Sequence, residues 1–150
     1  MAQNRIVAER SINAPAERVY RYLADYREHH PRILPPAFSD FRVEEGGVGA
    51  GTVIRFRVTA GGLVRSYYQL VAEPAPGRVL IEAGIESSEA TTFTVTPDGD
   101  RCRVRIVTTW EGAGGVGGFI ERLLAPRLLG PLYADELARL DRYAQEQGAA

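Results

Sequence analysis

Much of the chain alternates between apolar and polar positions with the period of two that is typical of β-strands. In residues 101–110 every second side chain is apolar or threonine, and arginines occupy the first three intervening positions. One face of this strand is therefore covered and the other meets water, as in an antiparallel sheet that packs on a single side. The same pattern, with turns rich in glycine and proline between the segments, predicts strands at residues 4–12, 38–45, 52–59, 63–73, 78–83, 90–96 and 101–110.

The strand predicted at residues 63–73 can turn either face toward the core. The set that contains Tyr68, with Val64, Ser66 and Leu70, is more apolar than the alternate set, so we expect it to face inward. A shift of one residue would place Arg65 and Gln69 inside instead, because neighbouring side chains of a strand point to opposite faces.

Helical spacing is found near both ends of the chain. A first helix begins within residues 14–17, where Pro15 suits a first turn whose N–H groups are unpaired and Glu17 complements the helix dipole. A second short helix is predicted at residues 25–34, before Pro35 and Pro36.

A long helix is predicted from Phe119 to about Gln147. Pro126 and Pro131 should kink or break it. The glycines at 112, 114, 115, 117 and 118 would form a flexible hinge before it.

This order of elements, with the strands in one block and the long helix last, indicates an α+β fold. We expect one domain over residues 1–150: a curved antiparallel sheet of about seven strands, two short helices, and the C-terminal helix across the apolar face. Only that last helix is long enough to cover the sheet.

The composition narrows the possible partners. Of 150 residues 45% are hydrophobic and 25% are charged, and the net charge is −1, so we expect no nucleic acid or anionic membrane as a partner. We see no secretory leader and no apolar run long enough to span a bilayer, and the single cysteine fits a reducing compartment. The expected location is therefore the cytoplasm, while the oligomeric state stays open.

Several local motifs, taken in order, resemble a known superfamily. They are Ile12-Asn13-Ala14-Pro15-Ala16-Glu17-Arg18-Val19, Leu23-Ala24-Asp25-Tyr26, His29-His30-Pro31, Glu73-Pro74-Ala75-Pro76-Gly77-Arg78-Val79-Leu80 and Tyr133-Ala134-Asp135-Glu136-Leu137-Ala138-Arg139-Leu140. Their order is similar to that of the START-like, or SRPBCC, superfamily, and in particular its polyketide cyclase/dehydrase and lipid-transport-like members. One departure is Ile33, where relatives often have tryptophan.

The resemblance implies a helix-grip fold around an apolar cavity and carries no shared catalytic residues. Tyr68, Trp110 and Tyr133 are of interest as lining residues, because each joins an apolar body to a hydrogen-bonding tip. A core filled entirely by side chains is the alternative. The full set of expected lining residues is Ile54, Phe56, Tyr68, Phe93 and Trp110 from the sheet, with Phe119, Leu123, Tyr133 and Leu137 from the helix.

Residues 112–117 match the dinucleotide fingerprint G-x-G-x-x-G between a strand and a helix. The fingerprint requires a second, parallel strand after that helix, and we predict none. We therefore expect no cofactor.

Few other residues suggest chemistry. Asp25 and His29 are spaced to share a helix face, and we place them at the mouth of the cavity, with a weaker hypothesis that they form an acid/base pair. No cluster of cysteine and histidine suggests a metal site. Cys102 lies on the apolar face of its strand and is expected in the core.

Three functions are compatible with these observations. The first is binding of a small hydrophobic molecule, such as a lipid, polyketide or isoprenoid, for transport, sequestration or sensing. The second is a cyclase- or aromatase-like enzyme, which would require two titratable groups converging inside the cavity. The sequence reveals no such pair, so enzymatic activity stays open. The third is a protein-interaction module, which an exposed apolar patch outside the cavity would favour.

Overall fold

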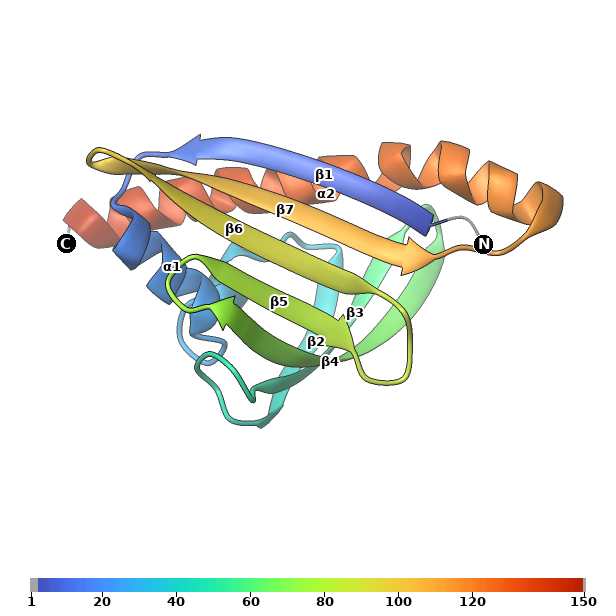
Figure 1. Ribbon diagram of the computed structural model, residues 1–150, viewed down its shortest axis with the longest axis horizontal. Helices are drawn as coiled ribbons and strands as arrows, with labels where there is room; N and C mark the ends of the chain where they lie inside the picture. The colour runs from blue at the N-terminus through green and yellow to red at the C-terminus, as the bar shows by residue number, and fades with distance from the viewer. Residues whose placement is uncertain (1–2, 150) are drawn as a thin grey trace.

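The computed structural model describes residues 3–149, and its strands form one antiparallel sheet in the order β1-β7-β6-β5-β4-β3-β2 (Figure 1). This confirms the predicted α+β helix-grip fold. The strands are β1 (Gln3–Ile12), β2 (Phe38–Glu45), β3 (Val53–Ala60), β4 (Leu63–Ala75), β5 (Val79–Gly84), β6 (Ala90–Asp98) and β7 (Arg101–Glu111). The helices are α1 (Ala16–Ala24), the single 3-10 turn η1 (His30–Ile33) and α2 (Gly115–Ala149).

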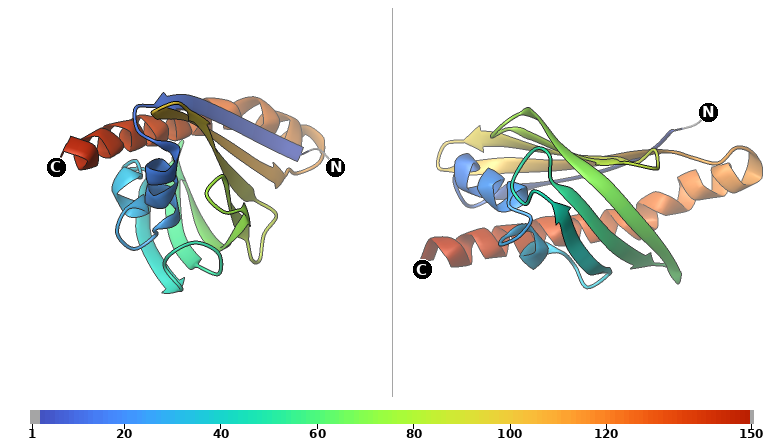
Figure 2. Two further views of the ribbon diagram at one scale, coloured as in Figure 1. Left: turned by 60° about the vertical axis from the view of Figure 1, so that its left-hand side comes forward. Right: turned by 90° about the horizontal axis from the view of Figure 1, so that it is seen from below.

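Helix α2 lies along the curved sheet and covers one of its faces (Figure 2). Its C-terminal half packs beside α1 and η1, whereas its N-terminal part extends past the sheet (Figure 1). None of the helices in residues 3–149 is long and apolar enough to cross a membrane.

The predicted second helix is reduced to η1, and Asp25 explains the difference. Its carboxylate accepts hydrogen bonds from the backbone N–H groups of Arg27, at 3.1 Å, and Glu28, at 2.9 Å. These bonds stabilise a turn after α1 in place of a helix.

Helix α2 begins at Gly115, earlier than predicted, and Pro126 and Pro131 lie inside it without breaking it. A proline removes one hydrogen bond of the helix, but packing can hold the two sides in line. Around these prolines, Ala125 packs with Ile6 and Trp110, and Leu129 and Tyr133 lie against the same cluster.

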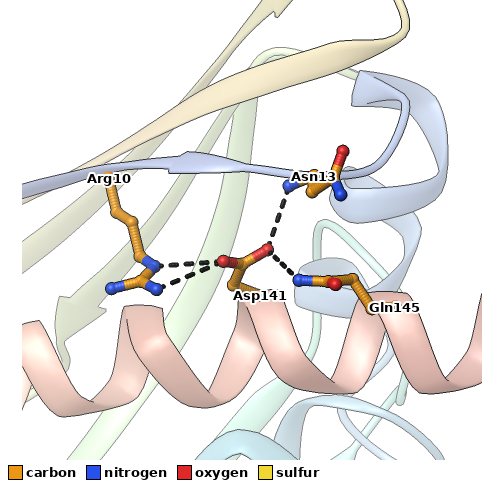
Figure 3. Close-up of polar contacts among 4 residues, drawn as sticks. All are labelled: Arg10, Asn13, Asp141 and Gln145. Carbon is orange, nitrogen blue, oxygen red and sulfur yellow. Dashed lines mark hydrogen bonds and ion pairs between the residues drawn. The ribbon is translucent and has the colours of Figure 1, made fainter.

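The C-terminal half of α2 is joined to β1 by Asp141 (Figure 3). Its carboxylate accepts hydrogen bonds from the backbone N–H of Asn13 at 3.0 Å, from Gln145 at 2.9 Å and from Arg10 at 3.2 and 3.3 Å. Burial acts to raise the pKa of Asp141, but these hydrogen bonds outweigh it and hold the pKa below its ordinary value.

Strand β7 turns the predicted face inward: Cys102, Val104 and Ile106 are fully buried. Strand β4 does the opposite of what we predicted. Gln69 is buried, whereas Leu70 is exposed and Tyr68 stacks under the Arg55 guanidinium on the outer face, 3.8 Å from it. The inner face of β4 places Tyr67 and Gln69 in the lining of a cavity and Val71 in the core.

The glycine motif joins β7 to α2. Every pair of neighbouring strands is antiparallel, and no strand follows α2 within the described residues. The βαβ unit that a dinucleotide fingerprint requires is therefore absent from residues 3–149.

Candidate functional site

A cavity of about 430 Å³ lies between the sheet and α2. Its wall is mainly aromatic and aliphatic, and the rings of Phe56 and Tyr67 stack within it with their centroids 5.0 Å apart. The apolar lining comprises Leu34, Phe38, Phe41, Ile54, Phe56, Val58, Ala60, Leu63, Tyr67, Phe93, Trp110, Ile120, Leu124, Ala125, Leu128, Leu129, Leu132 and Tyr133.

The cavity opens beside the N-terminal half of α2. Ile120, Leu124 and Leu128 belong to its lining and are also exposed to solvent. Across the opening, Arg65 of β4 forms an ion pair with Glu121 of α2, with 3.8 Å between Nη2 and Oε2. The opening is therefore bounded by apolar side chains with one ion pair at its edge.

At the other end, three titratable residues from three elements converge on the cavity. Nε2 of His30 in η1 lies 3.7 Å from Oε2 of Glu82 in β5 and 3.9 Å from Oε2 of Glu136 in α2. The hydroxyl of Tyr26 donates a hydrogen bond of 2.7 Å to Glu82, and the Tyr26 ring stacks on that of His30. All four side chains are buried. We call His30, Glu82 and Glu136 the acidic triad.

The backbone determines which nitrogen of His30 faces the carboxylates. Nδ1 lies 2.7 Å from the carbonyl oxygen of Leu23, which can only accept a hydrogen bond, so Nδ1 carries a hydrogen. Nε2 is then left facing Glu82 and Glu136. Both contacts, at 3.7 and 3.9 Å, are longer than hydrogen bonds, and a shared proton would make either of them attractive.

Burial also favours protonation of the two glutamates. It raises the pKa of Glu82, and the nearby His30 and the Tyr26 hydroxyl oppose this only in part. The pKa of Glu136 is raised well above its ordinary value, first by burial and then by the charge of Glu82. The acidic triad can therefore hold and exchange protons in a site shielded from bulk water.

Further polar groups of the lining come from neighbouring strands. Thr91 of β6 and Thr108 of β7 lie opposite each other, with 2.8 Å between their hydroxyl oxygens. Two buried polar atoms in the lining, Oε1 of Gln69 and Nε1 of Trp110, have no hydrogen-bond partner among the described residues. An unpaired buried polar group is costly, so both atoms lack a hydrogen bond that buried polar groups normally make.

Five of the residues expected from the sequence do line the cavity. They are Ile54, Phe56, Phe93, Trp110 and Tyr133. Four of them lie on inward faces of strands whose alternation is clear, and Tyr133 lies on the covered side of α2.

The other four expected residues lie elsewhere. Tyr68 faces outward because the register of β4 is shifted by one residue from the expected one. Phe119 and Leu123 are exposed, because they lie on a different face of α2 from Ile120 and Leu124, which line the cavity. Leu137 is packed in the core below the cavity.

Asp25 and His29 do not line the cavity either. The Asp25 carboxylate caps the turn after α1, and Nδ1 of His29 lies 2.6 Å from the hydroxyl of Tyr143 near the end of α2. The neighbouring His30 lines the cavity instead, at its buried end and not at the mouth where we expected His29.

Sequence reasoning missed the acidic triad. Glu82 alternates with Leu80 and so shares its buried face, but we did not use this spacing. Glu136 follows Tyr133 by three residues and precedes Leu140 by four, which is helical spacing. A charged residue at an otherwise buried position was the available signal in both cases.

The comparisons with known proteins agree with this geometry. The family model described as polyketide cyclase / dehydrase and lipid transport matches residues 3–145. The solution structure of KanY protein is 35% identical, with 97% of this chain and 99% of that chain covered, and has a TM-score of 0.85. No curated protein matches the sequence.

Two crystal structures with lower identity share the fold. A protein of Thermus thermophilus is 24% identical, with coverage of 95% of this chain and 98% of that one and a TM-score of 0.78. The Zhui aromatase/cyclase of a Streptomyces species is 15% identical, with coverage of 97% and 96% and a TM-score of 0.75.

Proposed function

Because the chain belongs to the polyketide cyclase / dehydrase and lipid transport family, we propose that it binds a small, largely apolar molecule in the cavity beneath α2. The bound molecule would be carried, sequestered or sensed. Its apolar part would lie against Phe56, Tyr67 and Phe93, and burial of that surface would stabilise the complex by about 25 cal/mol per Å² before ordering costs.

The observation that supports this proposal best is the apolar cavity itself, whose lining includes two side chains with an unpaired polar atom. Nε1 of Trp110 is a donor and Oε1 of Gln69 is an acceptor, and neither has a partner among the described residues. A core that is simply filled by apolar side chains would not need them. Both atoms are covered by neighbouring groups, so a ligand would pair with them only after a shift of the Trp110 or Gln69 side chain, and it would then take a defined orientation.

Adjacent tyrosines of β4 provide a matched test. Tyr67 lines the cavity and Tyr68 lies on the outer face, so the same substitution at each removes the same group from opposite sides. In a fluorescence titration with the neutral apolar dye Nile red, Tyr67→Ala should weaken binding about tenfold, or about 1.4 kcal/mol. Tyr68→Ala should leave the dissociation constant unchanged.

Equal effects of the two substitutions would place the dye outside the cavity and contradict the proposal. Native mass spectrometry of the freshly purified protein supplies an independent measurement. A bound mass that is lost in Tyr67→Ala and retained in Tyr68→Ala supports the proposal.

The acidic triad favours a second candidate, an enzyme that uses acid/base chemistry. Two titratable groups converging in the cavity were the requirement for this reading, and His30 lies between two buried carboxylates. Such a group can remove a proton next to a ligand's carbonyl and return one, the step that begins aldol-type cyclisation. An aromatase/cyclase with the same fold is compatible with this candidate.

Hydrogen exchange into a bound ketone tests this candidate without knowledge of the substrate. In deuterated water the protein should accelerate exchange at the carbons beside the carbonyl of phenylbutanone, as measured by proton NMR. His30→Gln and Glu82→Gln should abolish the acceleration, whereas His29→Gln, which changes the neighbouring ring, should retain it. Exchange at the uncatalysed rate with the native protein would contradict acid/base catalysis and leave the binding proposal standing.

A further inference from the structure

The charged groups of the cavity point to the chemical class of the ligand, on the premise that the proposed binding function is correct. We propose that the preferred ligand is an apolar molecule that carries a protonated amine, with the ammonium group held at the acidic triad.

The cavity lining has an excess of carboxylates. It contains five glutamates, Glu82, Glu89, Glu111, Glu121 and Glu136, against one arginine and one histidine. The whole chain is nearly balanced, with 19 acidic and 18 basic residues. The excess is therefore a local property of the cavity.

The buried end of the cavity has two carboxylates and only one basic side chain. His30 can carry one positive charge, which balances one of Glu82 and Glu136 but not both. Glu82 also accepts the hydrogen bond from Tyr26, whereas Glu136 has only the contact of 3.9 Å with His30 among the described residues. Glu136 is thus the buried carboxylate that most lacks a partner.

The outer part of the lining has the same imbalance. Arg65 is paired with Glu121. Glu89 and Glu111 have no basic side chain within 4 Å in residues 3–149, and Glu89 interacts instead with the hydroxyl of Ser87. A ligand enters past unpaired negative charge at the rim and reaches a carboxylate at the end.

This arrangement discriminates among ligands by charge. A carboxylate or phosphate would find no unpaired basic side chain at the acidic triad, and any ionised glutamate there would repel it. An ammonium group would supply the cation that the acidic triad lacks, and a buried carboxylate with a hydrogen-bonded cation is stabilised where an isolated one is not. A neutral ligand of the same shape would gain only the apolar contacts.

Three ligands of the same size and different charge test the inference: phenylbutylamine, phenylbutanol and phenylbutyrate. Trp110 is the only tryptophan and lines the cavity, so its fluorescence reports binding of each directly. The amine should bind about tenfold more tightly than the alcohol, and the butyrate should bind most weakly. Glu136→Gln should remove the preference for the amine while leaving the affinity for the alcohol within about twofold.

Glu146→Gln is the matched control, because it removes the same charge from an exposed position of the same helix. It should change none of the three affinities. Should Glu136→Gln not fold, Glu82→Gln removes the other carboxylate of the acidic triad and should also reduce the preference.

The outcomes separate the inference from the function on which it rests. If the alcohol and Nile red bind but the amine has no advantage, or if Glu136→Gln weakens the amine and the alcohol equally, the charge preference is wrong and the binding function stands. If neither Nile red nor any of the three ligands binds, the proposed function itself is overturned.

Discussion

Glu136 lies next to Leu137 in α2 and is also deeply buried, but its carboxylate faces His30 and Glu82 at the end of the cavity. Glu136→Gln would put a neutral amide of the same shape in this place, so that Glu82 would be the one acid still buried there. Glu136 therefore lowers the stability of the fold. A destabilising acid inside a cavity is consistent with a role in binding or proton transfer.

The buried glutamate should make stability depend on pH in a defined direction. Its folded pKa lies above the ordinary 4.5, so the folded protein holds a proton that the unfolded chain has already released. Between the two pKa values, rising pH therefore lowers the free energy of unfolding, by up to about 1.4 kcal/mol per pH unit for one proton. Urea unfolding from pH 5 to pH 8 should show a smaller decrease for Glu136→Gln than for the native protein.

Two other titratable groups face Glu136, and they too can contribute to the change of unfolding free energy with pH. They are His30 from η1 and Glu82 from β5. Glu82 has a raised pKa of its own, so part of the decrease should remain in Glu136→Gln. Glu146→Gln, at an exposed position, should follow the native curve; native-like behaviour of Glu136→Gln would contradict the burial argument.

At the scale of elements, the two halves of α2 differ in what they contact. The C-terminal half packs against α1 and η1, whereas the N-terminal half covers the cavity and exposes Val116, Phe119 and Leu123. The turn between β3 and β4 contacts the N-terminal half of α2 at Leu128, which belongs to the cavity lining. The rate at which a ligand enters and leaves should therefore depend on that contact.

Glycines with positive φ in two turns allow this contact to be tested. Gly61 has φ +59°, and a Cβ there would lie 3.2 Å from Leu128 Cδ1; Gly77 has φ +85° and open space around it. Replacement of either by alanine should cost about 1–2 kcal/mol of unfolding free energy because of the left-handed backbone. Only Gly61→Ala should also displace Leu128 and speed release of Nile red in stopped-flow experiments. Equal release rates in the two variants would show that the turn does not control the opening.

At the scale of the whole molecule, Asp141 joins the first strand to the last helix (Figure 3). Asp141→Asn keeps one acceptor for the N–H of Asn13 but loses the charge that binds Arg10, so we expect a loss of about 1 kcal/mol in unfolding free energy at pH 7. The lowered pKa means that this stabilisation exists above the ordinary pKa of 3.8 and disappears as pH falls through the folded value. Urea unfolding should show a lower free energy of unfolding for Asp141→Asn than for the native protein at pH 7. In acid the two free energies should become equal.

Asp135→Asn on the same helix is the control for Asp141→Asn. Asp135 pairs with Arg139 one turn away at 3.1 Å, within α2 alone. Such a pair contributes about 0.3–0.5 kcal/mol. An equal effect of both substitutions would mean that the link between β1 and α2 adds no stability beyond an ordinary ion pair of a helix.

The sequence by itself determined where the strands lie along the chain, which face of β7 points inward, and that a long helix comes last. Each of these follows from a period of two or 3.6 within one segment. It also placed Trp110 and Tyr133 in the lining. The comparison with a known superfamily, not the periodicity, carried the expectation of a cavity.

Only the tertiary structure decided which face of β4 meets the cavity and which buried charged residues lie beside one another there. A strand with two similar faces takes its register from its neighbours, so the sequence around Tyr67 and Tyr68 contained no decisive signal. His30, Glu82 and Glu136 belong to η1, β5 and α2, which are far apart along the chain. Their meeting depends on how these three elements pack, and no local pattern records it.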